Sequence, residues 1–157
     1  MVIGAGGASR GILPSLLKEQ PKSIVIANRT VEKAERIAKE FSSKALQTSK
    51  SSNLIASSLS FEALKDFEFD VVINATSVST NPSQNLNLDE SVFRNTSLAL
   101  DLYYSQAFTP FMDLADRAKV PNVIDGWGML VEQAAESFFL WTGFKPDTSE
   151  LIAKHGE

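Results

Sequence analysis

The sequence contains no cysteine, only one histidine and fewer basic than acidic residues, and each of these shortages narrows what the chain can do. Without cysteine there is no disulfide framework, thiolate nucleophile or cysteine-ligated metal site, and one histidine makes a transition-metal site unexpected. The formal net charge of −4 argues against nucleic-acid or anionic-membrane partners. No apolar run reaches the roughly 18 to 20 residues of a membrane-spanning helix, and the start does not resemble a signal peptide. We therefore expect a soluble, cytoplasmic protein.

The chain length is that of a single domain. Its 157 residues are 43% hydrophobic and 22% charged, which suits one compact domain with a hydrophobic core. A buried first strand usually has about five or six residues, yet only Met1, Val2 and Ile3 precede the first glycine. We therefore expect residues 1–157 to form one excised or truncated domain.

Short β-rich segments alternate with helical patterns from end to end, which predicts a mainly parallel sheet covered by helices. The expected strands are Val2–Ile3, Ser23–Ala27, Phe69–Asn74, Leu98–Leu102 and Asn122–Ile124. Apolar residues on one helical face indicate two crossover helices, the first with Ala8, Ile12, Leu13, Leu16 and Leu17, the second with Val31, Ala34, Ile37, Ala38 and Phe41.

Three further expectations concern irregular structure. Pro14 removes a helical hydrogen bond and predicts a kink in the first helix. The segments Gln47–Ser60 and Ser79–Asn87 are rich in Ser, Asn or Pro and lack a helical or strand period, so we expect them to be loops or poorly ordered.

The segment GAGGASR, residues 4–10, lies between the first strand and the first helix, where dinucleotide-binding domains place their glycines. Glycine permits a sharp turn and a close approach of the backbone to a pyrophosphate, and the helix N-terminus offers free N–H groups to that anion. Ser9 replaces the third glycine of the GxGxxG pattern, so the match is a variant. A glycine-rich turn without a ligand is the alternative interpretation.

The end of the second strand predicts which dinucleotide would bind. NAD-selective domains carry an acidic residue about 20 residues beyond the glycines, whereas this chain has Asn28, Arg29, Thr30 and then Lys33. Arginine and lysine would pair with a 2′-phosphate, which favours NADP. The alternatives are a solvated basic pair beside Glu32, and a structural N-cap role for Thr30.

Several sequence blocks together resemble the cofactor domain of the shikimate dehydrogenase family over essentially the whole chain. In chain order they are GAGGASR, IANRTVEKAE, DVVINATS, DLYYSQAFTP and DGWGMLVEQAAESFFLWTG. Glutamyl-tRNA reductases carry a similar glycine loop and NRT segment, so the last block is the decisive one. Quinate dehydrogenases share the architecture and stay open as an alternative, as does a non-catalytic NADP-binding module.

The resemblance implies a Rossmann-like, doubly wound α/β fold with a mainly parallel sheet and helices on both faces. It also implies an NADP-linked reduction of 3-dehydroshikimate to shikimate by a two-domain enzyme, whose N-terminal substrate domain lies outside this chain. By resemblance, cofactor contacts fall on Gly6, Gly7, Ala8, Asn28, Arg29, Thr30, Lys33, Thr76, Ser77, Leu102, Gly126 and Met129. Tyr104 and Gln133 correspond to the positions that reach the substrate.

The helical spacing agrees with part of this assignment. Met129 and Gln133 are four residues apart and would share one face of a helix that begins near Gly126. The alternatives are core packing for Met129 and an interface-facing aromatic role for Tyr104. We assign an apolar stripe of this helix to the core, namely Leu130, Ala134, Phe138 and Trp141. Val78-Ser79-Thr80 departs from the Gly-containing turn that often follows NATS in the family.

Reduction of a ketone requires an acid near the alkoxide oxygen, and in the resembled family a lysine and an aspartate of the N-terminal domain do this. Tyr103 and Tyr104 are not followed by the lysine of a Tyr-xxx-Lys pair, and His155 is expected to be solvated in a polar tail. We therefore expect no catalytic residue in this chain and cofactor binding without turnover. Exposure of Tyr104 and Met129 on the cleft face favours self-association, for example as a homodimer.

Overall fold

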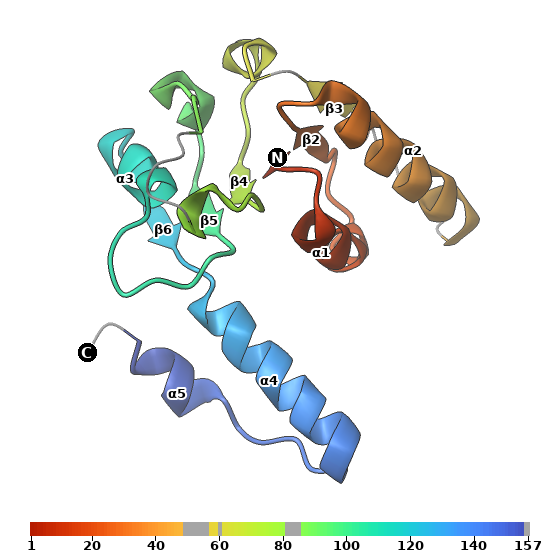
Figure 1. The fold of residues 1–157 in the computed structure, drawn as a ribbon, viewed down its shortest axis with the longest axis vertical. Coiled ribbons are helices and arrows are strands. Elements are labelled where there is room, and N and C mark those ends of the chain that lie inside the picture. Colours follow the sequence, from red (N-terminus) through yellow and green to blue (C-terminus); the bar gives the residue numbers. More distant parts are fainter. Residues whose placement is uncertain (49–56, 60, 81–85, 156–157) are drawn as a thin grey trace.

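The computed structural model describes residues 1–48, 57–59, 61–80 and 86–155 and contains a six-stranded, all-parallel sheet (Figure 1). The strand order is β3-β2-β1-β4-β5-β6. The strands are β1 (Val2–Ile3), β2 (Val25–Ala27), β3 (Ser57–Leu59), β4 (Val71–Asn74), β5 (Leu98–Asp101) and β6 (Asn122–Ile124). This order, with β1 between β2 and β4, is that of a dinucleotide-binding Rossmann fold.

The connections between the strands are helical. The α-helices are α1 (Gly7–Lys18), α2 (Val31–Thr48), α3 (Pro110–Arg117), α4 (Trp127–Thr142) and α5 (Ser149–Ala153). Three short 3-10 turns are η1 (Ala63–Asp66), η2 (Val78–Thr80) and η3 (Glu90–Phe93). Of the described helices, none is both long and apolar enough to cross a membrane.

Alternating side chains of the strands build one core on each face of the sheet. On one face Val2 and Ile26 pack with residues of α1 and α2, among them Leu13 and Ile37. The opposite core contains Ile3 and the apolar residues of η1, η3 and α3, including Leu64, Val92, Phe93 and Phe111. Successive strand residues point to opposite faces, and both faces are therefore covered by helices. The predicted doubly wound α/β fold is confirmed.

The fourth helix departs from our expectation. The stripe Leu130, Ala134, Phe138 and Trp141 was assigned to the core, and this was wrong because all four residues are exposed. The buried residues of α4 are Val131 and Ala135. The physical reason is that α4 packs mainly against α5 and extends away from the sheet instead of lying on it (Figure 1).

The structure corrects several local expectations. The expected loop Gln47–Ser60 contains the end of α2 and strand β3, while its remaining residues lie outside the described part. Within Ser79–Asn87, residues 81–85 also lie outside it, and Leu86 is buried. Pro14 lies inside α1, which is continuous from Gly7 to Lys18, and the expected kink stays a prediction.

Candidate functional site

A groove of about 590 Å³ crosses the carboxyl ends of β2, β1 and β4, and its volume lies in the usual range for ligand sites. It is the place where a doubly wound sheet binds its ligand, because the chain leaves β1 and β4 in opposite directions there. Of the sequence-predicted cofactor residues, the groove is lined by Gly6, Gly7, Ala8, Asn28, Arg29, Thr30, Lys33, Thr76 and Ser77.

The glycine turn forms the floor of this groove. Gly4 has a φ of +107°, and a Cβ there would lie 2.8 Å from the carbonyl oxygen of Ala75, so only glycine fits. Ser9 is fully buried and its hydroxyl donates a 2.7 Å hydrogen bond to the carbonyl oxygen of Gly4. The serine that replaces the third glycine therefore fastens the turn to the first turn of α1. Gly6 and Gly7 remain exposed, with backbone N–H groups at the helix N-terminus.

The basic end of the groove follows β2. The amide Nδ2 of Asn28 donates to the carbonyl oxygen of Thr30 at 2.8 Å, which shapes the turn into α2. Arg29 and Lys33 are exposed, and within the part of the chain that the structure describes neither forms an ion pair. Two cations without a carboxylate partner at the start of a helix fit an anionic group of a ligand.

The opposite wall follows β4 and is held by the buried carboxylate of Asp101 at the end of β5. Asp101 accepts hydrogen bonds from Asn74 Nδ2 (3.1 Å), Ser79 Oγ (2.5 Å), Thr109 Oγ1 (2.7 Å) and the backbone N–H of Tyr103 (3.1 Å). Thr109 also caps α3, accepting from the N–H of Met112. One carboxylate thus joins the loops that follow β4 and β5, and its charge is compensated by donors.

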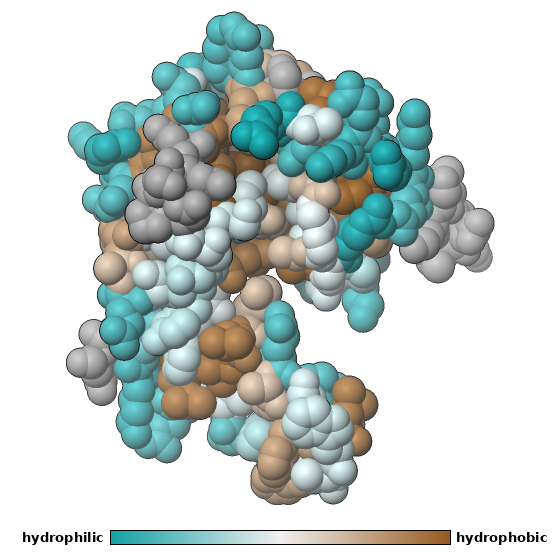
Figure 2. Space-filling view, in the orientation of Figure 1, coloured by the Kyte–Doolittle hydropathy of each residue, from teal (hydrophilic) through white to brown (hydrophobic). Residues whose placement is uncertain are grey.

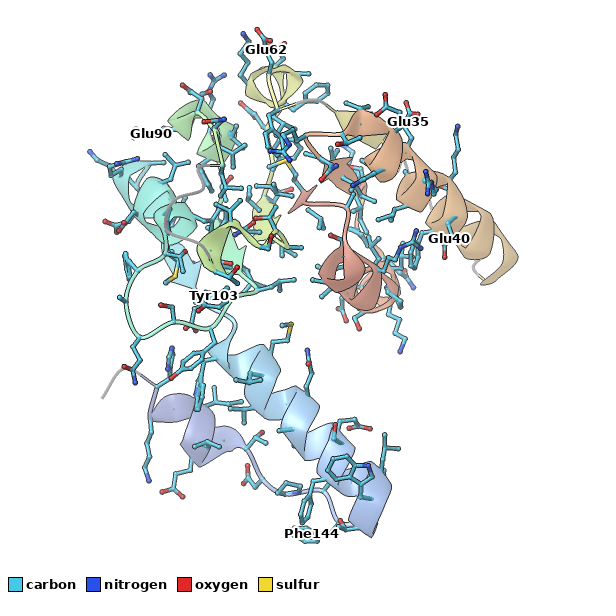
Figure 3. All side chains as sticks on the ribbon, in the orientation of Figure 1. Glu35, Glu40, Glu62, Glu90, Tyr103 and Phe144 are labelled. Atoms are coloured by element: carbon cyan, nitrogen blue, oxygen red, sulfur yellow. The ribbon has the colours of Figure 1, made fainter. Side chains whose placement is uncertain are left out.

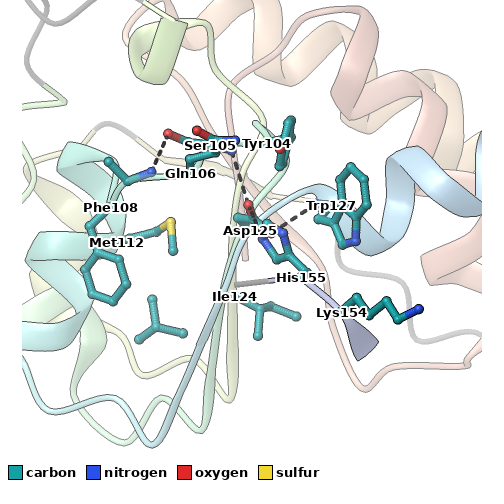
Figure 4. Close-up of a pocket in the computed structure, with 12 residues that line it drawn as sticks. Tyr104, Ser105, Gln106, Phe108, Met112, Ile124, Asp125, Trp127, Lys154 and His155 are labelled. Atoms are coloured by element: carbon teal, nitrogen blue, oxygen red, sulfur yellow. Dashed lines mark hydrogen bonds and ion pairs between the residues drawn. The ribbon is translucent and has the colours of Figure 1, made fainter. Parts of the chain in front are cut away.

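A second hollow, of about 760 Å³, lies beside β6 (Figure 4). Asp125 accepts from the N–H groups of Trp127 (3.0 Å) and Ser105 (3.2 Å) and lies 2.9 Å from His155 Nε2. The rings of Trp127 and His155 stack with centroids 5.2 Å apart, and the Tyr104 ring lies 4.9 Å from that of Trp127. His155 is exposed, as expected, and its ring also packs against Trp127 and lies beside Asp125.

The remaining predicted residues lie outside the groove. Gly126 approaches the loop after β5 so closely that a Cβ would lie 2.2 Å from the carbonyl oxygen of Leu102. Met129 is partly buried in the first turn of α4, and Gln133 is exposed one turn further along. Tyr104 lines the hollow beside β6.

Other groove residues were not predicted from the sequence, namely Phe61, Val78, Leu86 and Asn87. They belong to irregular segments whose position depends on packing across the sheet, so no local pattern marks them. Among the described residues no group of His, Asp or Glu could hold a metal ion.

Comparison with known proteins identifies the family. The family model described as "Shikimate / quinate 5-dehydrogenase" matches residues 1–104, and a second model, "Shikimate 5'-dehydrogenase C-terminal domain", matches residues 126–153. The chain belongs to the shikimate dehydrogenase family. The two matches favour this family over the alternative of a glutamyl-tRNA reductase domain.

Curated proteins and solved structures resemble the chain along nearly its whole length. "Shikimate dehydrogenase (NADP(+))" of Nitrosospira multiformis is 43% identical over 97% of this chain and 52% of its own length. Among solved structures, an enzyme from Pseudomonas putida has a TM-score of 0.82 and 38% identity, over 99% of this chain and 54% of its own. The enzyme of Thermus thermophilus, solved with NADP(H) and shikimate, has a TM-score of 0.74 and 30% identity, over 94% and 50%. The chain spans about half the length of these relatives.

Proposed function

We propose that this chain is the NADP(H)-binding part of a shikimate dehydrogenase, the enzyme that interconverts 3-dehydroshikimate and shikimate. The observation that carries the proposal is the groove in which the glycine turn meets Arg29 and Lys33, two cations without an ion-pair partner among the described residues. The relatives named as NADP(+) enzymes support it, and so does the solved NADP(H) complex of the Thermus thermophilus enzyme.

Different residues of the groove would bind different parts of the cofactor. Exposed N–H groups of Gly6, Gly7 and Ala8 at the start of α1 would bind the pyrophosphate. Arg29 and Lys33 would pair with the 2′-phosphate, beside the turn formed by Asn28 and Thr30. The following wall residues would line the path of the nicotinamide or contact it: Thr76, Ser77, Leu102, Gly126 and Met129. When bound, the cofactor would supply or accept the hydride.

We find no acid placed for the substrate among the residues that the structure describes. We infer that a lysine and an aspartate of a separate substrate domain would protonate the alkoxide oxygen, as in the resembled family. Tyr104 and Gln133 would contact the substrate from the cofactor side. Asp101 and Asp125 cannot take the acid's place, since each carboxylate is already engaged by groups of this chain. On this proposal the chain binds NADP(H) but does not turn over alone.

The exposed apolar face of α4 and α5 indicates an interface with another part of the enzyme. Leu140, Trp141 and Phe144 are 74%, 82% and 64% exposed, and Figure 2 shows apolar surface on this lobe. Phe144 lies at the end of the lobe, far from the sheet (Figure 3). Contiguous exposed apolar surface marks an interface. We propose that the half of the relatives' length that this chain does not span covers this face.

Cofactor selectivity tests the proposed function. The double variant Arg29→Ala/Lys33→Ala should lose NADP+ affinity by about 30- to 300-fold and leave NAD+ affinity within about threefold, because charge-assisted hydrogen bonds contribute roughly 1.5–3 kcal/mol each and part of this is screened at exposed sites. Isothermal titration calorimetry measures both ligands. Arg94→Ala, an exposed arginine that follows η3, is the matched control and should bind NADP+ like the wild type.

A wild-type chain that prefers NAD+, or that binds neither dinucleotide, would contradict the proposal. The absorbance of NADPH measures whether the isolated chain reduces NADP+ when shikimate is added. Such turnover would contradict the catalytic part of the proposal.

A further inference from the structure

The 3-10 turn η2, which follows β4, carries a hydroxyl at Ser79, in the segment where the chain departs from the family's frequent Gly-containing turn. Ser79 Oγ donates a 2.5 Å hydrogen bond to Asp101 Oδ2 and accepts one of 3.1 Å from Asn74 Nδ2. Asn74 Nδ2 also donates to Asp101 Oδ1 at 3.1 Å. These side chains therefore close a hydrogen-bonded ring between the ends of β4 and β5.

The same ring continues to the wall of the groove. Asn74 Oδ1 accepts from the backbone N–H of Thr76 (3.1 Å) and from its hydroxyl (2.7 Å), and Thr76 Oγ1 accepts from the N–H of Val78 (3.3 Å). Thr76, Ser77 and Val78 all line the groove. The position of this wall is thus coupled to Asp101. The hydrogen bond from Ser79 connects the end of the same segment to the Asp101 carboxylate.

We propose that Ser79 is a positioning residue that holds the wall formed by Thr76, Ser77 and Val78 in place for the nicotinamide half of NADP(H). This inference rests on the proposed function. In this strand order a dinucleotide extends from the β2 side, where Arg29 and Lys33 lie, to the β4 side. The wall after β4 therefore faces the nicotinamide half, and the adenosine half does not depend on it.

Removing the hydroxyl should loosen the wall without unfolding the chain. Asp101 keeps its hydrogen bonds from Asn74, Thr109 and the backbone of Tyr103, so the carboxylate does not become unpaired. A wall that is then held only through Asn74 has more freedom, which must be lost when the ligand binds, and this ordering weakens affinity. The loss should appear for a ligand that contacts the wall and should be absent for one that does not.

The experiment compares NADP+ with adenosine 2′,5′-bisphosphate, which lacks the nicotinamide half, by calorimetric titration of the full chain. Ser79→Ala and Ser79→Gly should each weaken NADP+ binding about five- to tenfold and leave the bisphosphate within about twofold. Ser79→Thr keeps the hydroxyl and should restore most of the NADP+ affinity. Ser97→Ala is the matched control, because that exposed serine bonds the Asp70 carbonyl at the opposite end of β5.

Each result decides the matter. Unchanged NADP+ affinity in either folded variant would overturn the inference, and so would an equal loss for both ligands, which indicates a general structural role. If Ser79→Ala does not fold, Ser79→Gly carries the comparison, since glycine is frequent in this turn of the family. A wild-type chain that binds neither ligand would instead contradict the proposed function. Selective loss for NADP+ with rescue by threonine supports the inference.

Discussion

At the scale of single residues, Gly126 and Gly128 differ in the space around them. A Cβ on Gly126 would lie 2.2 Å from the carbonyl oxygen of Leu102, whereas the nearest atom to one on Gly128 is a methyl of Ile152 at 3.9 Å. Gly126→Ala should therefore lower the free energy of unfolding by about 2–4 kcal/mol. Gly128→Ala, inside α4, should leave it unchanged or raise it by up to about 1 kcal/mol. Urea denaturation measures both, and equal effects would contradict the close approach at Gly126.

The residues of the site fall into two groups according to how well the sequence predicted them. The glycine turn, Arg29 and Lys33 were predicted to lie together, because each belongs to a local pattern at a strand end. The long-range hydrogen bonds of Asp101 and Asp125 were not, since those partners lie in other loops, 27 residues away for Asn74 and Asp101 and 20 for Ser105 and Asp125. A contact of that kind exists only once the strands have paired.

At the scale of elements, β1 is preceded by the partly buried amino group of Met1. The N-terminal ammonium of Met1 donates a 2.6 Å hydrogen bond to the carbonyl oxygen of Val71 in β4. Desolvation lowers its pKa from 8.0 to about 6, and Asp70 opposes this shift. The unfolded chain therefore binds more protons than the folded chain between these values. The free energy of unfolding is therefore highest, as far as this group is concerned, above pH 8. It falls as the pH decreases towards 6, and below pH 6 this group causes little further change.

The expected result is a free energy of unfolding that is lower at pH 6 than at pH 8.5 by up to about 2–3 kcal/mol. Chemical denaturation across this pH range measures it, with mass spectrometry to verify an intact Met1. N-terminal acetylation removes the ammonium and is the control, because all other groups titrate equally in both samples. An acetylated chain with the same pH dependence would exclude this assignment.

The helices show why an apolar pattern does not specify its partner. The spacing of Leu130, Phe138 and Trp141 indicated one apolar face, and α4 is a helix from Trp127 to Thr142. The face is exposed because a pattern records amphipathicity and not the surface that covers it. For α1 and α2 the same reasoning succeeded for most of the named residues, since the strands that flank each helix lie within the chain. Ala8 is the exception in α1, because it is exposed and lines the groove. The third strand was missed because Ser57–Leu59 carries no recognisable alternation.

At the scale of the whole molecule, the face of α4 and α5 should control self-association. The double variant Leu140→Glu/Trp141→Glu should shift the sedimentation distribution of the isolated chain towards monomer, because two charges on exposed apolar positions oppose burial of the face. Phe67→Glu changes an exposed aromatic residue outside this face and should leave the distribution unchanged. A wild-type chain that stays monomeric at about 100 μM, which excludes a dimer with a Kd of about 10 μM or below, would contradict the expectation.

The central position of β1 also sets the order in which the sheet can be completed. Its residues Val2 and Ile3 pair with β2 on one edge and with Ile73 and Asn74 of β4 on the other. During synthesis, β1 can therefore pair with β2 early. Its other edge stays unpaired until β4, some 70 residues downstream, leaves the ribosome. Because these two strands are far apart in the sequence, the pairing of β1 with β4 should be the slow step of folding. The unpaired edge of β1 should then be the part of the sheet that chaperones bind most readily.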